Sequence, residues 1–322
     1  MTDYDPPAST ESRVDALLDG MAGVVLGQDR VLRHMLIALL ADGHALLEGV
    51  PGTAKTLAVR VLARSLDLRF GRIQFTPDLM PSDLIGVSVL NRAEGTFEYR
   101  PGPVFTDLLL ADEINRAPAK TQSALLEAME EKRVTVDGKS RSLPAAFTVF
   151  ATQNPVEYEG TYPLPEAQLD RFLLKIDVGY PDEAAERALL DMYAEGFDAR
   201  RLDQSGLRPV FSAAELGTLR AKVRATHVEP RVRDYITQIV RVTRAEPSFS
   251  LGASPRAGVA LFLAARAEAF LNGRDFVTPD DVKALSFPVL RHRVLLTPEA
   301  EVEGVAPDQR LRTLLESLEA PR

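Results

Sequence analysis

The hydrophobic and polar positions divide the chain into two parts. Up to about residue 180, short apolar runs bounded by Gly and Pro alternate with stretches whose apolar residues recur at helical spacing. From Pro181 on, only helical patterns follow, with capping starts such as Ser212 with Glu215. The pattern predicts an α/β domain with a parallel sheet, followed by an all-helical domain. The apolar runs expected to form the strands are His44–Leu47, Arg69–Phe75, Val104–Ala111, Phe147–Ala151 and Leu173–Val178.

The same pattern suggests three consecutive regions. We expect a disordered tail over residues 1–12, an α/β core over 13–180 and a helical domain over 181–322. Ser254 before Pro255 and Thr278 before Pro279 are typical helix starts and support helices in the last region. A chain of 322 residues is long enough for about two domains of usual size.

Two segments interrupt the alternation of strands and helices in the α/β part. Residues 76–103 contain a strand-like pair, Val87–Leu90 and Thr96–Tyr99. Residues 134–143 predict a second hairpin that turns through Asp137 and Gly138. Compact domains seldom carry such long connections without a use for them, so we expect both inserts to serve function.

Composition and charge narrow the class of protein. The chain has 45% hydrophobic and 26% charged residues, which is typical of a globular protein. Its lack of cysteine excludes disulfides, thiolate metal sites and thiol nucleophiles. The net charge of −8 disfavours non-specific nucleic-acid binding. Residues 1–12 do not read as a signal peptide, and no apolar stretch is long enough to cross a membrane, so we expect a cytoplasmic protein.

A glycine-containing loop follows the first predicted strand and opens a helix. This context is the one that a phosphate-binding loop requires, because inward-facing amides and the helix N-terminus cradle phosphate oxygens. Lys55 is then expected to reach the β- and γ-phosphates, and Thr56 to bind Mg²⁺. The alternative is a plain strand-to-helix turn with a surface lysine. The residues expected to bind the nucleotide are Gly49, Val50, Pro51, Gly52, Thr53, Ala54, Lys55, Thr56 and Leu57.

Ala54 departs from the general loop pattern, which has glycine before the lysine. We expect Ala54 to begin the right-handed helix, where an alanine is sterically acceptable. The departure therefore weakens the motif match more than the chemistry.

Two further strands end in polar side chains. Asp112 and Glu113 follow the third apolar run, so they are expected at the carboxyl edge of the sheet. There Asp112 would hold Mg²⁺ through water, and Glu113 would orient an attacking water. Asn154, after the fourth run, is expected to hydrogen-bond the γ-phosphate or that water. The alternatives are a helix cap for the acidic pair and a turn residue before Pro155 for the amide.

Five motifs, in this order, resemble the MoxR family of AAA+ ATPases. The resemblance extends from about residue 14 to about residue 290, and the Ala54 form of the loop is usual in that family. It implies an ATPase with a P-loop AAA+ domain and a helical lid. The motifs are Gly49–Thr56, Asp112–Pro118, Gln153–Pro155, Leu164–Phe172 and Ser254–Ala257.

The resemblance also implies roles for individual residues. Asn154 would be the sensor-1 residue, Arg171 the arginine finger that faces a neighbouring subunit's nucleotide, and Arg256 the sensor-2 arginine of the lid. Val24–Gln28 resembles the segment that packs against adenine, so Gln28 is a candidate nucleotide contact; core packing is the alternative. Residues 76–103 would be the insert in helix 2, and residues 134–143 the pre-sensor-1 hairpin.

Three arginines keep alternative interpretations. A cation in the first turn of a helix is disfavoured by the helix dipole, so a nearby anionic ligand would explain Arg256; a surface arginine is the alternative. Arg171 would equally pair with the adjacent Asp170. Arg116 points either at the nucleotide and subunit interface or into solvent. The four histidines are isolated in sequence and predict no metal site.

Taken with the resemblance, the sequence predicts hydrolysis of ATP with Mg²⁺, coupled to remodelling or maturation of partner protein complexes. The resemblance implies a hexameric ring, a protein client and a partner with a von Willebrand factor A domain. The alternatives are a magnesium-chelatase-like subunit, a nucleic-acid motor, or a nucleotide-dependent switch with negligible turnover. The sequence does not identify the client.

Overall fold

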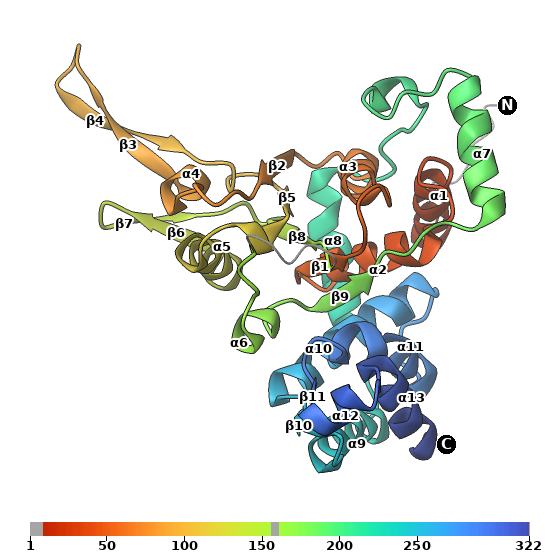
Figure 1. Cartoon of the computed structure of the whole chain (residues 1–322). Helices are drawn as coiled ribbons and strands as arrows, with labels where there is room; N and C mark the ends of the chain where they lie inside the picture. Colours follow the sequence, from red (N-terminus) through yellow and green to blue (C-terminus); the bar gives the residue numbers. More distant parts are fainter. Residues whose placement is uncertain (1–8, 156–160, 322) are drawn as a thin grey trace, which may run out of the picture.

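Five parallel strands form the central sheet of the protein (Figure 1). The computed structural model describes residues 9–155 and 161–321. The strand order is β2-β5-β8-β1-β9, and every neighbouring pair runs in parallel, so all five strands end at one edge. The predicted α/β class is confirmed. The strands are β1 (Ala45–Glu48), β2 (Phe70–Gln74), β5 (Leu108–Asp112), β8 (Thr148–Gln153) and β9 (Leu174–Asp177).

The three central strands β5, β8 and β1 are buried on both faces of the sheet, which is why they are apolar without alternation, whereas the edge strands β2 and β9 carry partly exposed polar residues. Along β5, Leu108 and Leu110 belong to one hydrophobic cluster, and Leu109 belongs to the other. The first cluster includes α1 (Thr10–Ala22), α2 (Asp29–Leu40) and α3 (Lys55–Ser65) and continues into the helical domain. The second includes α4 (Pro81–Ile85) and α5 (Ala119–Glu131).

The N-terminal tail is shorter than predicted. Ser9 caps α1 by accepting a hydrogen bond from the Ser12 amide at 3.1 Å, so the helix begins at Thr10. Val14 and Leu17 bury the inner face of this helix, which holds its first turn in place. The prediction of disorder is therefore wrong for residues 10–12; residues 1–8 lie outside the described residues.

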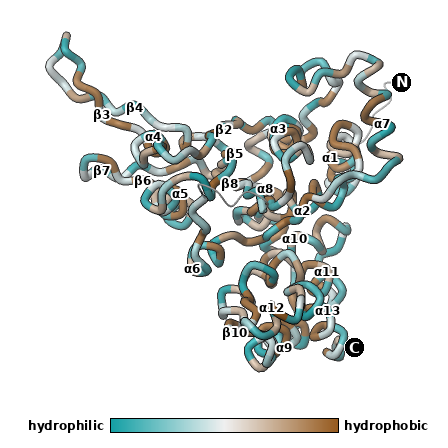
Figure 2. The backbone as a smooth tube through the Cα atoms, viewed as in Figure 1, coloured by the Kyte–Doolittle hydropathy of each residue, from teal (hydrophilic) through white to brown (hydrophobic). Residues whose placement is uncertain are grey.

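Both predicted hairpins are confirmed. Strands β3 (Gly86–Asn91) and β4 (Thr96–Pro101) form a ribbon that projects from the body, with a hydrophilic tip (Figures 1 and 2). Strands β6 (Arg133–Val136) and β7 (Lys139–Ser142) form the second hairpin. The two meet where the Arg141 guanidinium stacks 3.7 Å from the centre of the Tyr99 ring.

The C-terminal part is helical, with one exception. A two-stranded antiparallel ribbon joins β10 (Phe249–Leu251) to β11 (Leu295–Leu296), so the expectation of helices alone is wrong there. Strands of two or three residues are too short to leave a periodic signal. The division at residues 180 and 181 stays a prediction. The remaining helices are α6 (Glu166–Leu169), α7 (Glu183–Ala194), α8 (Ala213–Ala225), α9 (Pro230–Ala245), α10 (Pro255–Leu271), α11 (Pro279–Leu290), α12 (Pro298–Val302) and α13 (Pro307–Ser317), with 3-10 turns at Ile114–Arg116 and Leu202–Gln204.

Buried arginines tie the helical part to the sheet. Arg220 of α8 donates to the carbonyls of Leu39 and Ala145, at 3.0 and 2.8 Å. Arg293 donates to the Asp170 carboxylate at 2.7 Å and to the Phe172 carbonyl at 2.6 Å. Each charge is compensated by several acceptors, which a buried guanidinium needs.

Three of the four histidines, His34, His44 and His292, are buried, and His227 is exposed. No cluster of His, Asp or Glu that suits a metal occurs among the described residues. In the part of the chain that the structure covers, no helix is long and apolar enough to cross a membrane.

His44 is buried; its Nδ1 accepts from the Val149 amide at 2.9 Å, and its Nε2 lies 3.1 Å from the Met129 carbonyl. Burial lowers the pKa of His44 to about 4, and that of His34 to about 4 as well.

These pKa values predict loss of stability in mild acid. A histidine with a pKa of 6.5 in the unfolded chain and about 4 in the folded protein binds its proton first in the unfolded state. The free energy of unfolding should therefore fall as the pH drops from about 6.5 to about 4, by at most roughly 3 kcal/mol for His44. Urea unfolding at several pH values measures it. His44→Gln should flatten the slope, whereas exposed His227→Gln should not; equal slopes in all three proteins would contradict the assignment.

Candidate functional site

A cavity of about 510 Å³ opens at the carboxyl edge of the sheet. The loop between β1 and α3, the ends of β5 and β8, and part of α7 line it. The predicted site residues that meet there are Pro51, Gly52, Thr53, Ala54, Lys55, Thr56, Leu57, Asp112, Glu113 and Asn154.

In the loop before α3, two backbone carbonyls bind the side chain of Lys55. Gly49 is required at its start, because a Cβ there would lie 2.3 Å from the Val178 carbonyl oxygen. Lys55 Nζ donates to the carbonyls of Gly49 and Val50, both at 2.7 Å. Burial lowers the pKa of Lys55, although the nearby Asp112 and Glu113 carboxylates oppose this. The lysine is thus held beside the loop, with its charge inside the cavity.

Ala54 does not begin the right-handed helix as expected. Its φ is +62° and its ψ 17°, in the left-handed region, and α3 begins at the next residue. For an alanine this conformation costs about 1–2 kcal/mol. The glycine of the general pattern would avoid this cost, so the steric argument from the sequence is wrong. The strain lies directly at the cavity, where such outliers cluster.

Thr152 of β8 holds the acidic pair. Its hydroxyl donates to Asp112 Oδ1 at 2.6 Å and accepts from the Glu113 amide at 2.8 Å. The other Asp112 oxygen accepts from Arg72 of β2 at 2.7 Å. Glu113 has a φ of +55° and makes no side-chain cap, so the helix-cap alternative is wrong for this residue.

The Glu113 carboxylate is held on one oxygen by two donors. Gln74 of β2 donates to Oε2 at 2.6 Å, and Arg116 donates to the same atom at 3.2 Å. Arg116 therefore points toward the site. Asn154 is buried and reaches the cavity from the end of β8.

Several site residues were missed in the sequence. Arg72, Gln74 and Thr152 are polar residues in or at the end of apolar strands, and that position was the available signal. Leu189 and Tyr193 of α7 border the cavity across from the loop, and only the fold reveals their position.

Five predicted residues do not line the cavity. Two of them, Gly49 and Val50, belong to the loop and bind Lys55 through their carbonyls, and the other three lie elsewhere. Gln28 is buried and donates to the Gly179 carbonyl at 2.9 Å, and it does not line the cavity. Arg171 and Arg256 are also absent from it. Both pair with one carboxylate, Glu130 at the end of α5: Arg171 with Oε2, and Arg256 with Oε1 at 2.8 Å.

The shared carboxylate corrects two expectations. The ion-pair partner of Arg171 is Glu130 rather than the adjacent Asp170. Asp170 instead accepts from Arg293 at 2.7 Å and from the Ser254 hydroxyl at 3.0 Å. The anion beside the first turn of α10 is thus a protein carboxylate. Arg171 and Arg256 stand together on one face, outside the cavity.

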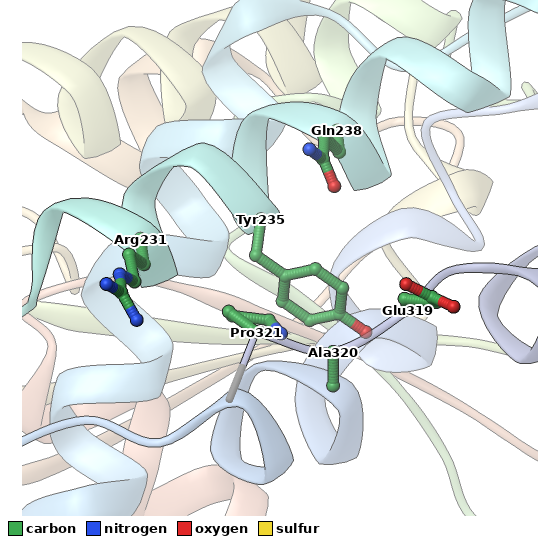
Figure 3. Close-up of a pocket in the computed structure, with 6 residues that line it drawn as sticks. All are labelled: Arg231, Tyr235, Gln238, Glu319, Ala320 and Pro321. Atoms are coloured by element: carbon green, nitrogen blue, oxygen red, sulfur yellow. The ribbon is translucent and has the colours of Figure 1, made fainter.

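A second cavity, of about 600 Å³, lies in the helical part (Figure 3). Arg231, Tyr235 and Gln238 of α9 line it together with residues 319–321. The Tyr235 hydroxyl is buried and has no hydrogen-bond partner among the described residues. None of the predicted site residues lies here, so the sheet edge remains the candidate site.

Comparisons with known proteins agree with this geometry. A family model described as "ATPase family associated with various cellular activities (AAA)" matches residues 44–174, and one described as "AAA lid domain" matches residues 241–314. The chain is 48% identical to the protein YeaC of Bacillus subtilis, over 92% of each chain. It is 43% identical to Chaperone MoxR1 of Mycobacterium tuberculosis, over 93% of this chain and 80% of that one. A solved structure from Cytophaga hutchinsonii, 42% identical, matches with a TM-score of 0.88 over 97% and 96% of the two chains.

The hydrogen bonds of Thr152 predict a positioning role. Thr152→Val keeps the shape of the buried side chain but removes both bonds to the acidic pair. We expect turnover of ATP to fall about 10- to 100-fold while ATP binding changes little. Thr152→Ser should restore most of the rate because it keeps the hydroxyl. Steady-state kinetics and fluorescent-nucleotide titration measure the two effects; full activity in Thr152→Val would contradict the role.

Proposed function

This chain belongs to the MoxR family of AAA+ ATPases, and from that premise we propose that it hydrolyses ATP to remodel or mature partner protein complexes. The observation that carries the proposal is the meeting of Lys55, Glu113 and Asn154 in one cavity.

The loop and α3 would bind the phosphates. The first amides of a helix have no partners within it and favour anions, and the first three residues of α3, Lys55–Leu57, line the cavity. Lys55 would exchange its carbonyl partners, Gly49 and Val50, for β- and γ-phosphate oxygens. Oxygen donors suit Mg²⁺, and the cavity offers the Thr56 hydroxyl and the Asp112 carboxylate. The ion, when bound, would neutralise charge on the phosphates.

Glu113 would position the attacking water. Gln74 and Arg116 both donate to one oxygen of this carboxylate, so the other oxygen is oriented for a further partner. Its contribution would be chiefly to orient the water. Asn154, buried beside it, would hydrogen-bond the water or the γ-phosphate.

Arg171 and Arg256 would act on the nucleotide of a neighbouring subunit. Both are absent from the cavity of their own chain, and both are fixed to Glu130. Their paired guanidinium groups form a cationic face for a phosphate group supplied from outside. A closed ring of copies, hexameric by analogy with the family, would bring each face to the next cavity.

The two hairpins would contact the client. Leu90 and Phe97 form a cross-strand pair on the β3–β4 ribbon, and Phe97 is 74% exposed. A cleft of about 810 Å³ separates this ribbon from the β6–β7 hairpin. Exposed apolar side chains of this kind mark interaction sites. The occupant would be a client protein, presented with a partner that has a von Willebrand factor A domain.

Two substitutions separate binding from hydrolysis. Lys55→Ala should abolish ATP binding because it removes the cation nearest the phosphates. Glu113→Gln should bind ATP but not turn it over, because the amide is a poor substitute for the carboxylate that positions water. Phosphate release and nucleotide titration measure both. The ATP-bound Glu113→Gln protein is also the reagent for capturing clients; normal turnover by this variant would rule out Glu113 as the positioning group.

The ring predicts complementation between inactive variants. Arg171→Ala should bind ATP yet lose turnover by about 10³-fold or more, as removal of a trans finger does in GTPases. Mixed with Glu113→Gln, it should recover some activity, because one subunit supplies the glutamate and the other the arginine. Arg256→Ala should show the same loss of turnover and the same recovery on mixing. Arg208→Ala, which removes an exposed arginine, should show neither. No recovery, together with turnover independent of protein concentration, would place both arginines outside a shared site.

A further inference from the structure

An apolar groove runs between α9 and α10 in the helical part. It has a volume of about 540 Å³. Ile236 and Val240 of α9 and Phe262 of α10 supply apolar walls. Gly258 of α10 lies on the floor of the groove close to α9, where a Cβ would be in van der Waals contact with Val240 Cγ2 at 3.6 Å. Val259, on the rim, is 57% exposed. The groove is therefore large enough for a side chain from another helix.

The rim of this groove is basic. Arg233, Arg241 and Arg244 lie on one face of α9, and no acidic side chain lines the groove. Arg244 donates to the Ala253 carbonyl at 2.7 Å. Arg233 and Arg241 have no ion pair with any carboxylate that the structure describes. The charge of the groove thus fits an apolar ridge flanked by carboxylates.

Helix α7 has the complementary surface. None of its residues is buried, and Leu190 is 72% exposed. Glu183 and Glu186 occupy its first turn, where Glu183 pairs with Arg187 at 3.2 Å, and Asp191 follows Leu190, so Glu186 and Asp191 are the carboxylates nearest to it without an ion pair among the described residues. A helix this exposed gains little from its own chain, because helix stability in proteins comes mainly from packing of one face. Its apolar side chains match the apolar walls of the groove, and its carboxylates match the basic rim.

The two surfaces cannot meet within one chain. Figure 1 shows α7 and the α9–α10 pair at opposite ends of the molecule. A contact between them joins two copies head to tail, and such contacts repeat into rings or filaments.

The proposed active site supports the same contact between two copies. Arg256 lies one turn before Val259 on α10, and Leu189 and Tyr193 of α7 border the nucleotide cavity. If Arg256 reaches a neighbour's phosphate, the groove beside it reaches the neighbour's α7. We propose that the α9–α10 groove binds α7 of a second copy of this chain, with Leu190 as the inserted side chain. The inference rests on the trans role of Arg256.

Cross-linking tests the contact directly, because the chain has no cysteine of its own. Leu190→Cys and Val259→Cys proteins, mixed with ATP and a mild oxidant, should form a disulfide-linked dimer on non-reducing gels. The matched control is Val302→Cys on α12, where the valine is 89% exposed. Cross-linking of Leu190→Cys to the control as strongly as to Val259→Cys, or to neither, would overturn the proposal.

Assembly gives a second, independent readout. Leu190→Asp and Val259→Asp should each weaken self-association about tenfold or more, because each places a charge in an apolar contact. Val302→Asp should not. Each chain keeps one intact surface, so the mixture should form dimers that neither variant forms alone. Sedimentation at several concentrations measures this. Wild-type assembly in both variants, or a wild-type chain that stays monomeric with ATP, would overturn the contact.

The outcomes separate this inference from the proposed function. Complementation between Arg171→Ala and Glu113→Gln without the cross-link leaves the ATPase proposal intact and places the interface elsewhere. The specific cross-link without turnover supports the interface and removes the proposed activity.

Discussion

Parallel pairing in the sheet is the constraint on which the site depends. Because β8 pairs with β1 on one side and with β5 on the other, its carboxyl end lies between the phosphate loop and the acidic pair. Thr152 and Asn154 emerge there, and the hydroxyl of Thr152 fixes both carboxylate-bearing residues. Antiparallel pairing of any one strand would send its polar end to the opposite edge. The site therefore depends on the order and direction of the strands, which bring its residues together, as much as on the residues themselves.

The sequence predicted the structure correctly where a residue pattern has a single structural explanation. Apolar runs identified all five strands, and the loop, Asp112 and Glu113 were placed together because parallel strands end at one edge. It was less informative where a contact joins distant segments. Nothing local links Gln74 to Glu113 or Glu130 to Arg171 and Arg256. Backbone angles could not be predicted from the sequence either, because the left-handed conformation of Ala54 depends on the shape of the whole loop.

Glu130 organises the face opposite the phosphate loop. One carboxylate bonded to two guanidinium groups leaves a net positive charge at that point, with both arginines held at a fixed spacing. Side chains as long as arginine lose much rotamer freedom when they bind a ligand, so fixing them beforehand reduces the cost of binding. In the proposed contact between subunits, the same carboxylate would compete with a phosphate for both cations. The strength of that competition would set how readily the face exchanges one anion for another.

The pairing of Asp170 has a mechanical consequence. Its two oxygens are bound by Arg293, which follows α11, and by Ser254, which precedes α10. Arg293 also binds the carbonyls of Asp170 and Phe172, on either side of Arg171. A rotation of the helical part relative to the sheet would therefore act on the backbone on both sides of Arg171, while Glu130 of α5 holds its guanidinium. The segment works as a mechanical linkage, in which tension from the helices is transmitted to the chain that carries this arginine.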